Sequence, residues 1–530
     1  MKATYLDYSA TNSFSPSLIR YLENDPKLNP FISFRPDLEG FKKLLETKKP
    51  TADRNLLVKV LKEQYSRLPD QASAMVIKNI DLLSQKNTYT VTTGHQLNLF
   101  TGPLYFIFKI VTAINLAREL KANFPKHNFV PLYWMATEDH DFAEINHTYI
   151  AGKKITWDTD SAGATGRLST GSIKKALKEY IRILGISENA DKLGNLITRA
   201  YTSYTNLADA TRHLVNALFE DYGLVILDAD DKRLKKQFTP IISDDIIQQN
   251  SFRLISDTNK NLEEAGIEPQ VNQREINFFY LKDGLRERIV LENNNYQVLN
   301  TETRFNTMEL QQEINDHPER FSPNVVMRTL YQEVILPNLA YIGGGAEIIY
   351  WLQLKQTFDH YSVDFPILLL RNSALLATQN LESKLARVDL TFKDIFKKSE
   401  QLNKEWVLNH TEHSLQLADE WQEMTCIFEK IKLRAYKIDP TLGPSAEAVK
   451  ARLHKAIKNL EAKLIKAEKR NFSNALSQID SIKTKLFPNG GLQERKENFG
   501  LFYVKHGDDF IGTLVSYFKP LDLKFTILEE

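Results

Sequence analysis

The feature that most constrains the fold is a strand–helix–strand pattern over residues 88–136. A β-branched and aromatic run from Thr88 to Thr92 ends at Gly94, and a mostly apolar stretch begins at Pro103. Pro103 suits the first turn of a helix, because its missing N–H would have no partner there. A helix that is apolar over most of its circumference is buried, here against a parallel sheet. Ligands of such sheets bind at the carboxyl ends of the strands, so the pattern predicts a small-molecule site.

Length and composition indicate a globular protein of several domains. The chain has 530 residues, of which 42% are hydrophobic, and this length allows roughly two to four domains. Its net charge of +1 predicts no whole-chain attraction to nucleic acid or to an anionic membrane. The single cysteine, Cys426, excludes an internal disulfide and a cysteine-rich metal site. No signal-peptide core is evident, and Lys109 and Arg118 interrupt the most apolar stretch, so we expect a cytoplasmic protein.

Changes of pattern along the chain predict a parallel α/β core that insertions interrupt. Short apolar runs at 223–228 and 365–370 suit strands that are buried on both faces. The expected divisions are 1–149 for the N-terminal part of the core, 150–222 for a helical insertion, 223–235 for a core strand, 236–323 for a mixed insertion with a small antiparallel sheet near 270–300, 324–385 for the rest of the core, 386–486 for an α-helical coiled coil, and 487–530 for a C-terminal segment that packs on the core.

Two heptad patterns predict a helical hairpin. Apolar residues recur at spacings of three and four, as in a coiled coil; they are Leu417, Trp421, Met424, Phe428, Ile431 and Ala435, then Leu453, Ile457, Leu460, Leu464 and Ala467. Residues 439–444 break the helix, and Ser445 is the expected N-cap of the second one, which extends to about 486. Because the second helix is longer, apolar surface would stay uncovered, and we expect a homodimer through the coiled coil.

The first candidate site is the turn that follows the first strand. Gly94, His95 and Gln96, with Thr101 and Gly102 before the helix, could present N–H groups to an anion such as a phosphate. The alternative is an ordinary loop whose glycines serve turn geometry. Neither a G-x-G-x-x-G fingerprint nor a Walker loop is present.

A second candidate site follows the next strand. Glu138, Asp139, His140 and Asp141 could hold an ammonium group or serve as general bases. A metal site built from Asp139, His140 and His147 is a competing interpretation, and solvated loop charge is a third. There is no H-E-x-x-H motif and no cysteine ligand, so we predict no metal.

The third candidate site is a glycine stretch. Gly343, Gly344 and Gly345 would let backbone approach a ligand, and Glu347 follows at a predicted helix start. A flexible connector is the alternative. Arg328 and Arg371 are further candidates for binding an anion, although lone arginines are more often structural. The lysines of the second coiled-coil helix are expected to be a solvated face.

Four blocks of sequence resemble one known family. They are TGHQLNLFTGPLYFIFKI, WMATEDHDFAEINH, LPNLAYIGGGAEIIYWLQLK and FPNGGLQER, and they are similar to the cysteine-adding enzymes of bacillithiol biosynthesis. The resemblance implies a Rossmann-like core related to nucleotidyltransferases and class I aminoacyl-tRNA synthetases. It also implies connecting-peptide insertions and a coiled coil that forms a homodimer.

The resemblance further implies a ligase reaction, in which cysteine is added to the amine of glucosaminyl-malate in the last step of the pathway. ATP and a cysteinyl-adenylate are expected by analogy with the synthetase-like fold. The strand-end acids would then be catalytic, the two glycine loops would bind the cofactor, and Glu347, Arg328 and Arg371 would bind substrate. A ligase for another amino acid or amine is the alternative enzyme. A dimeric scaffold or nucleic-acid-binding protein is the non-enzymatic alternative.

Overall fold

The computed structural model describes residues 1–49, 52–68, 72–377 and 381–530. The described residues form two compact units. The first consists of residues 1–9, 13–376 and 491–528, and the second of 10–12, 377–490 and 529–530. No helix in these ranges is long and apolar enough to cross a membrane.

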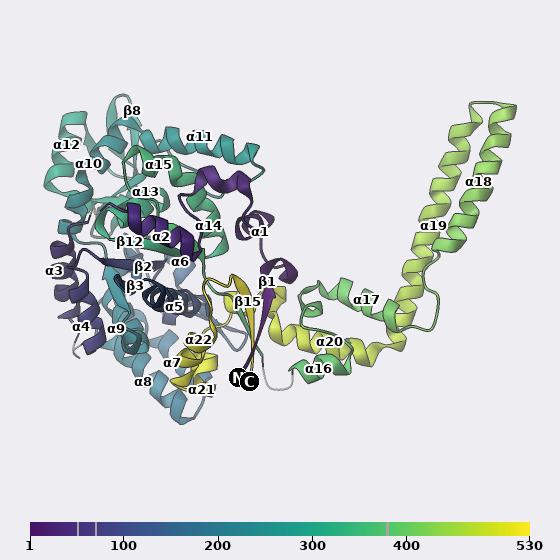
Figure 1. The fold of residues 1–530 in the computed structure, drawn as a ribbon, viewed down its shortest axis with the longest axis horizontal. Coiled ribbons are helices and arrows are strands. Elements are labelled where there is room, and N and C mark those ends of the chain that lie inside the picture. Colours follow the sequence, from purple (N-terminus) through teal and green to yellow (C-terminus); the bar gives the residue numbers. More distant parts are fainter. Residues whose placement is uncertain (50–51, 69–71, 378–380) are drawn as a thin grey trace. The chain divides into compact units, whose positions relative to one another are not determined.

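A parallel sheet forms the centre of the first unit (Figure 1). Its five strands lie in the order β13–β12–β2–β3–β6, and each neighbouring pair is parallel. If these five strands are numbered 1 to 5 in chain order, their order across the sheet from β6 to β13 is 3-2-1-4-5. This is the Rossmann arrangement, in which the order of strands changes direction between β2 and β12. The predicted Rossmann-like sheet is therefore confirmed. The strands are β2 (Thr88–His95), β3 (Asn128–Met135), β6 (Val225–Asp228), β12 (Asn338–Gly343) and β13 (Ile367–Leu370).

Helix α5 (Tyr105–Asn123) connects β2 to β3 and packs on both strands (Figure 1). Its apolar side chains join Val91, Leu339 and Ile367 of the sheet in one buried cluster. Each fully buried side chain of this kind contributes roughly 1.5–3 kcal/mol relative to an exposed one. The buried helix that residues 103–120 predict is therefore confirmed.

Strand β12 corrects one expectation. The glycine stretch is no separate loop, because Gly343 is the last residue of a fully buried central strand and Gly345 is the first of helix α14 (Gly345–Trp351). Only Gly344 lies between them, and its N–H donates to Glu347 Oε2 at 2.7 Å. The chain thus passes from strand to helix within one residue.

The insertions carry their own small sheets. The antiparallel sheet predicted near 270–300 is confirmed, and its strand order is β10–β9–β8–β7–β11. The predicted helical insertion begins with a hairpin of β4 (His147–Ile150) and β5 (Lys153–Thr156) and continues as helices. The remaining strands are β7 (Phe278–Lys282), β8 (Leu285–Glu292), β9 (Asn295–Val298), β10 (Arg304–Phe305) and β11 (Phe321–Pro323).

Further helices complete the first unit, and both ends of the chain join one sheet of order β1–β15–β14. The strands are β1 (Lys2–Asp7), β14 (Ala374–Ala377) and β15 (Lys524–Glu529). The helices are α1 (Pro16–Leu22), α2 (Leu38–Thr47), α3 (Arg54–Tyr65), α4 (Ala74–Leu82), α6 (Phe142–Ile145), α7 (Lys174–Leu184), α8 (Glu188–Thr202), α9 (Leu207–Phe219), α10 (Lys232–Gln248), α11 (Asn250–Glu264), α12 (Thr307–Asp316), α13 (Val325–Ile335), α15 (Lys355–His360), α21 (Gly500–His506) and α22 (Asp509–Tyr517).

The second unit is helical, as the heptad patterns predict. Helices α18 (Ala418–Ile438) and α19 (Leu442–Asn471) pack along each other, and Trp421 stacks on His454 at 4.4 Å between ring centroids. The other helices are α16 (Leu381–Arg387), α17 (Ser399–His410) and α20 (Ser473–Leu486).

Two details of the hairpin differ from the expectation. The second helix begins at Leu442, so Ser445 lies inside it and is not its N-cap. Pro444 is tolerated because the first N–H groups of a helix have no partner within the helix. The predicted single helix is interrupted at Phe472, after which α20 begins.

Candidate active site

A cavity of about 850 Å³ lies at the carboxyl ends of all five parallel strands. Much of its lining comes from the residues that end or follow these strands: Gly94–Gln96, Met135–His140, Ala229–Asp230, Gly344–Glu347 and Arg371. A volume of this size suits a small molecule of metabolite size, for which roughly 300–1,000 Å³ is usual. The three predicted clusters therefore meet in one place.

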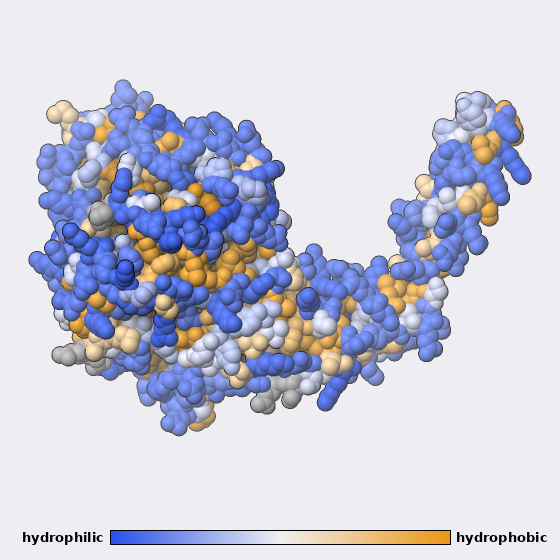
Figure 2. Space-filling model, in the orientation of Figure 1, coloured by the Kyte–Doolittle hydropathy of each residue, from blue (hydrophilic) through white to orange (hydrophobic). Residues whose placement is uncertain are grey.

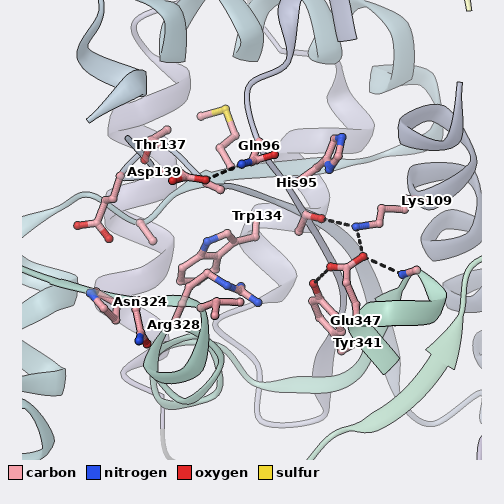
Figure 3. A pocket seen from close by; sticks show the side chains of 18 of the residues that line it. His95, Gln96, Lys109, Trp134, Thr137, Asp139, Asn324, Arg328, Tyr341 and Glu347 are labelled. Atoms are coloured by element: carbon pink, nitrogen blue, oxygen red, sulfur yellow. Dashed lines mark hydrogen bonds and ion pairs between the residues drawn. The ribbon is translucent and has the colours of Figure 1, made fainter. Parts of the chain in front are cut away.

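The end of the cavity between β2 and β12 is built around a buried ion pair (Figure 3). Lys109 of α5 contacts Glu347 and donates to the carbonyl of Gly94 at 2.9 Å. Glu347 also accepts from the Tyr341 hydroxyl and the Gly344 N–H, both at 2.7 Å. Strands β2 and β12 and helices α5 and α14 are thus joined at the point where the order of strands in the sheet changes direction.

Each member of this pair favours the charged form of the other. Burial raises the pKa of Glu347, but Lys109 and the hydrogen bonds outweigh burial and leave that pKa below its ordinary value. Burial lowers the pKa of the Lys109 ammonium, and Glu347 opposes the change. The two opposite charges cancel, so this pair brings no net charge to a ligand.

Arg328 lies beside this pair and is held differently. Its guanidinium lies 5.8 Å from the ring centroids of both Trp134 and Tyr341, and it donates to Gln332 Oε1 at 3.1 Å. Arg328 forms no ion pair with any residue in the described part of the chain. Its positive charge therefore faces the cavity without an acid in direct contact, because the nearby Glu347 is already paired with Lys109 (Figure 3).

His95 lines the same end but is held as a neutral imidazole. Its ring packs on Tyr105 and Phe106, with centroid distances of 5.4 and 5.3 Å. Burial, together with the charge of Lys109, lowers the pKa of His95 to about 3. Its Nε2 atom is buried and lacks a hydrogen-bond partner among the described residues.

Asp139 dominates the opposite end of the cavity. Its Oδ2 accepts from Gln96 Nε2 at 2.6 Å, and its Oδ1 accepts from the His140 N–H at 2.7 Å (Figure 3). Burial raises the pKa of Asp139, but these hydrogen bonds and Arg286 lower it far below its ordinary value. Asp139 is therefore a fixed negative charge at neutral pH.

Glu138 is held by another buried cation. It pairs with Lys235, a fully buried residue of α10 that also donates to the carbonyl of Phe321 at 2.9 Å. Burial raises the pKa of Glu138 to about 7, against the opposing effect of Lys235. A carboxyl group with a pKa near neutrality can take up and release a proton under physiological conditions.

Arg286 and Phe279 of the antiparallel insertion close this end together with His140, which follows β3. Arg286 of β8 donates to His140 Nδ1 at 2.7 Å, and its guanidinium lies 4.0 Å from the ring centroid of Phe279. All three side chains line the cavity. The insertion therefore supplies part of the wall.

Some predicted residues lie outside this lining. The carbonyls of Phe100 and Gly102 accept from Asn498 Nδ2 at 2.8 and 2.7 Å, and the Leu104 N–H donates to Glu497 at 2.7 Å. Thr101 and Gly102 thus face the C-terminal segment, and neither they nor Gly343 line the cavity. Their predicted role in cofactor binding has no geometric support.

Asp141 and Arg371 are occupied by structural contacts. Asp141 is outside the lining and caps α6 by accepting from the Glu144 N–H at 3.2 Å. Arg371 lines the cavity, but its guanidinium is buried and donates to Glu494 Oε1 at 2.6 Å. Neither arrangement supports the predicted catalytic or substrate-binding role.

The competing metal interpretation gains no support. Within the described ranges no group of three or more His, Cys, Asp and Glu side chains is placed to hold a metal ion. Asp139 and His140 line the cavity, whereas His147 lies outside its lining, in β4, and its Nδ1 lies 3.1 Å from Asn146 Oδ1.

Several lining residues were missed from the sequence. Lys109 could have been found, because a lysine within an otherwise apolar buried helix needs a partner. Trp134 and Tyr341 look like ordinary strand residues in the sequence. Arg286 lies far along the chain in an insertion, and no local pattern places it near the strand ends.

The comparisons with known proteins cover the whole chain. The family descriptions "Bacillithiol biosynthesis BshC, N-terminal Rossmann-like domain" and "Bacillithiol biosynthesis BshC, C-terminal coiled-coil domain" match residues 1–372 and 374–530. Proteins named "Putative cysteine ligase BshC" from Flavobacterium psychrophilum and Flavobacterium johnsoniae are 44% and 43% identical, over 100% of both chains in each comparison.

A solved structure was also similar over much of the chain. It is titled as a "putative arginyl t-RNA synthetase" from Campylobacter jejuni and covers 87% of this chain and 96% of its own, with 11% identity. Its TM-score of 0.21 is too low to establish a common fold.

Proposed function

Because the chain belongs to the BshC family of bacillithiol biosynthesis, we propose that it joins cysteine to the amine of glucosaminyl-malate. The bond formed is an amide between the cysteine carboxyl carbon and the sugar nitrogen. The observation that supports this best is the cavity itself, which combines a fixed carboxylate, Asp139, with a cation that lacks an acidic partner, Arg328. Both substrates carry ammonium and carboxylate groups.

The two ends of the cavity suit these opposite charges. Asp139 keeps its negative charge and can bind an ammonium group. Arg328 presents a guanidinium, whose planar N–H groups match a carboxylate or a phosphate. A ligand that spans the cavity would therefore place its amine near β3 and its anionic groups near β12.

ATP is part of the proposal, because a free carboxylate must be activated before it forms an amide. When bound, ATP would supply the leaving group for that activation. Arg328 and the backbone at Gly345 are the lining groups that fit phosphate oxygens, since the Gly344 N–H already donates to Glu347. The predicted partners Thr101 and Gly102 are replaced in this proposal by residues at the end of β12.

The amine must lose a proton as the amide forms. We assign that proton to Glu138, whose pKa of about 7 lets it accept a proton near neutral pH. Asp139 is too acidic for this task and instead orients the amine. Lys235 holds Glu138 in place throughout.

Incubation of the purified protein with cysteine, glucosaminyl-malate and ATP tests the proposal. Mass spectrometry should detect the amide product, and omission of ATP should abolish it. The matched control replaces cysteine with serine, which differs only in the thiol. Product from another amino acid alone would favour the alternative ligase. Absence of product under all conditions would contradict the ligase proposal.

We also propose that a second copy of the chain covers the hairpin. Helix α18 contains no buried residue, and Ile427, Ile431 and Leu433 are exposed by 55%, 45% and 62%. Figure 2 shows orange, apolar patches along the hairpin. Light scattering should give the mass of a dimer, and Ile431→Lys with Leu433→Lys should give a monomer. A monomeric parent protein at micromolar concentration would contradict this.

A further inference from the structure

The cationic side chains of the cavity fall into two groups. Five lysine and arginine residues line it. Three have an acidic partner: Lys109 with Glu347, Arg371 with Glu494, and Arg286 with Asp139, the last at 4.0 Å. Arg328 and Arg495 form no ion pair with any residue that the structure describes.

The acidic side chains show no matching surplus. Four carboxylates line the cavity: three contact a cation directly, and Asp139 has Arg286 at 4.0 Å. Glu347, Glu138 and Asp139 have been described, and Asp230 accepts from Arg167 at 3.0 and 3.2 Å. The lining therefore carries an excess of positive charge at Arg328 and Arg495, which a ligand with anionic groups would neutralise.

Arg495 owes its position to the two residues before it. Gln493 and Glu494 are buried, and their side chains bind backbone near β14. Gln493 Oε1 accepts from the Leu376 N–H at 3.0 Å, and Glu494 Oε2 accepts from the Ala374 N–H at 2.9 Å. The backbone at Arg495 is thus fixed, although its own side chain is exposed.

The fixed backbone distinguishes Arg495 from an ordinary solvated arginine. Its guanidinium lies 6.0 Å from the ring centroid of Phe14, which comes from the other end of the chain. It also lies near Tyr105, whose ring centroid is 5.2 Å from the Arg371 guanidinium, and all three residues line the cavity. Arg371 is neutralised by Glu494, so Arg495 is the available cation on this side.

We propose that Arg495 is a substrate-binding residue, which the C-terminal segment contributes to the cavity, and that it shares an anionic ligand with Arg328. The ligand group is a cluster of anionic oxygens, either the carboxylates of the malyl group or the phosphates of a nucleotide. The identity of these two ligands rests on the proposed function. The charge excess does not, because it follows from the contacts alone.

Titration calorimetry on the full chain tests the proposal without turnover. Glucosaminyl-malate and ATP with magnesium are titrated separately into the parent protein, Arg495→Ala, Arg495→Lys and Lys496→Ala. The last is a matched control, since Lys496 is the next residue, has the same charge, contacts the Tyr149 ring and is outside the cavity lining.

Arg495→Ala should bind one or both ligands about tenfold or more weakly, Arg495→Lys should recover part of the loss, and Lys496→Ala should bind normally. The loss should shrink at high salt, because screening weakens an exposed charge contact. Weaker binding of glucosaminyl-malate alone assigns Arg495 to a carboxylate, and weaker binding of ATP alone assigns it to a phosphate.

Binding of both ligands within twofold of the parent by a folded Arg495→Ala protein would overturn the proposal. Failure of the parent to bind either ligand would overturn it as well. Arg495-dependent binding without any amide product would refute the proposed function only. Normal product formation with no role for Arg495 would refute this inference only.

Discussion

The two ends of the cavity use the same kinds of charged side chain in different ways. At the β12 end, Lys109 and Glu347 contact each other and tie together helices α5 and α14 and strands β2 and β12. At the β3 end, Asp139 is fixed mainly by the neutral donors Gln96 and the His140 N–H, and its nearest cation, Arg286, is 4.0 Å away. A pair in direct contact is part of the framework, whereas a carboxylate fixed by neutral donors keeps its charge for a ligand.

The largest expected effect is the loss of stability when the Lys109–Glu347 pair is broken. Lys109→Met leaves Glu347, whose side chain is only 25% exposed, without its cation, and removal of one partner of a buried pair costs up to about 3–5 kcal/mol. Urea unfolding followed by circular dichroism should show a loss of this size. Lys109→Met combined with Glu347→Gln should recover part of it, because no charge then remains unpaired. A loss below about 1 kcal/mol in the single variant would show that the pair is not structural.

The next effect is a loss of turnover without a loss of stability, at Asp139. Asp139→Asn keeps the shape of the side chain but removes the fixed charge, so turnover should fall by about 100-fold or more. Thermal unfolding should change little. Glu144→Gln is the matched control, because Glu144 also accepts from Gln96, at 2.8 Å, but lies outside the lining. Equal losses in both variants would remove the special role of Asp139.

The smallest effect concerns pH. Glu138 must be deprotonated to accept a proton, and its pKa is raised to about 7, so turnover should rise as the pH increases through about 7. Glu138→Gln should lack this rise and should be slower at every pH. The same rise in Glu138→Gln would assign it to another group. The rate constant kcat, measured from pH 5.5 to 8.5, decides between these outcomes.

The raised pKa of Glu138 also determines whether stability rises or falls with pH. A carboxyl group whose folded-state pKa is raised contributes stability that is present below its ordinary value of 4.5 and is lost as the pH rises through about 7. Between these limits the parent protein should therefore lose stability with rising pH, through this group, relative to Glu138→Gln.

Local pattern was enough to predict the centre of the fold. The run from Thr88 to Gly94 and the apolar helix after Pro103 have the periods of a buried strand and a buried helix, and both elements are present. The turn after the first strand and the acids after the second are predicted to lie at one sheet edge, because parallel strands end on the same side. That inference needed no tertiary information.

Long-range contacts were beyond local pattern. The glycine stretch does not predict strand β12, which ends at Gly343 and is buried between β2 and β13. Asp141 looked like Asp139 in the sequence, but only the structure shows that it caps a helix. Arg286 and Lys235 enter from insertions, and Arg495 enters from the end of the chain.

The dependence of the site on the C-terminal segment has a consequence for synthesis on the ribosome. A nascent chain that ends at residue 376 already contains all five parallel strands. It lacks Glu494, the acid that neutralises buried Arg371, and Asn498, whose amide binds the carbonyls of Phe100 and Gly102. The helical hairpin is therefore translated before the residues that complete the cavity, and the site can form only after nearly the whole chain has emerged.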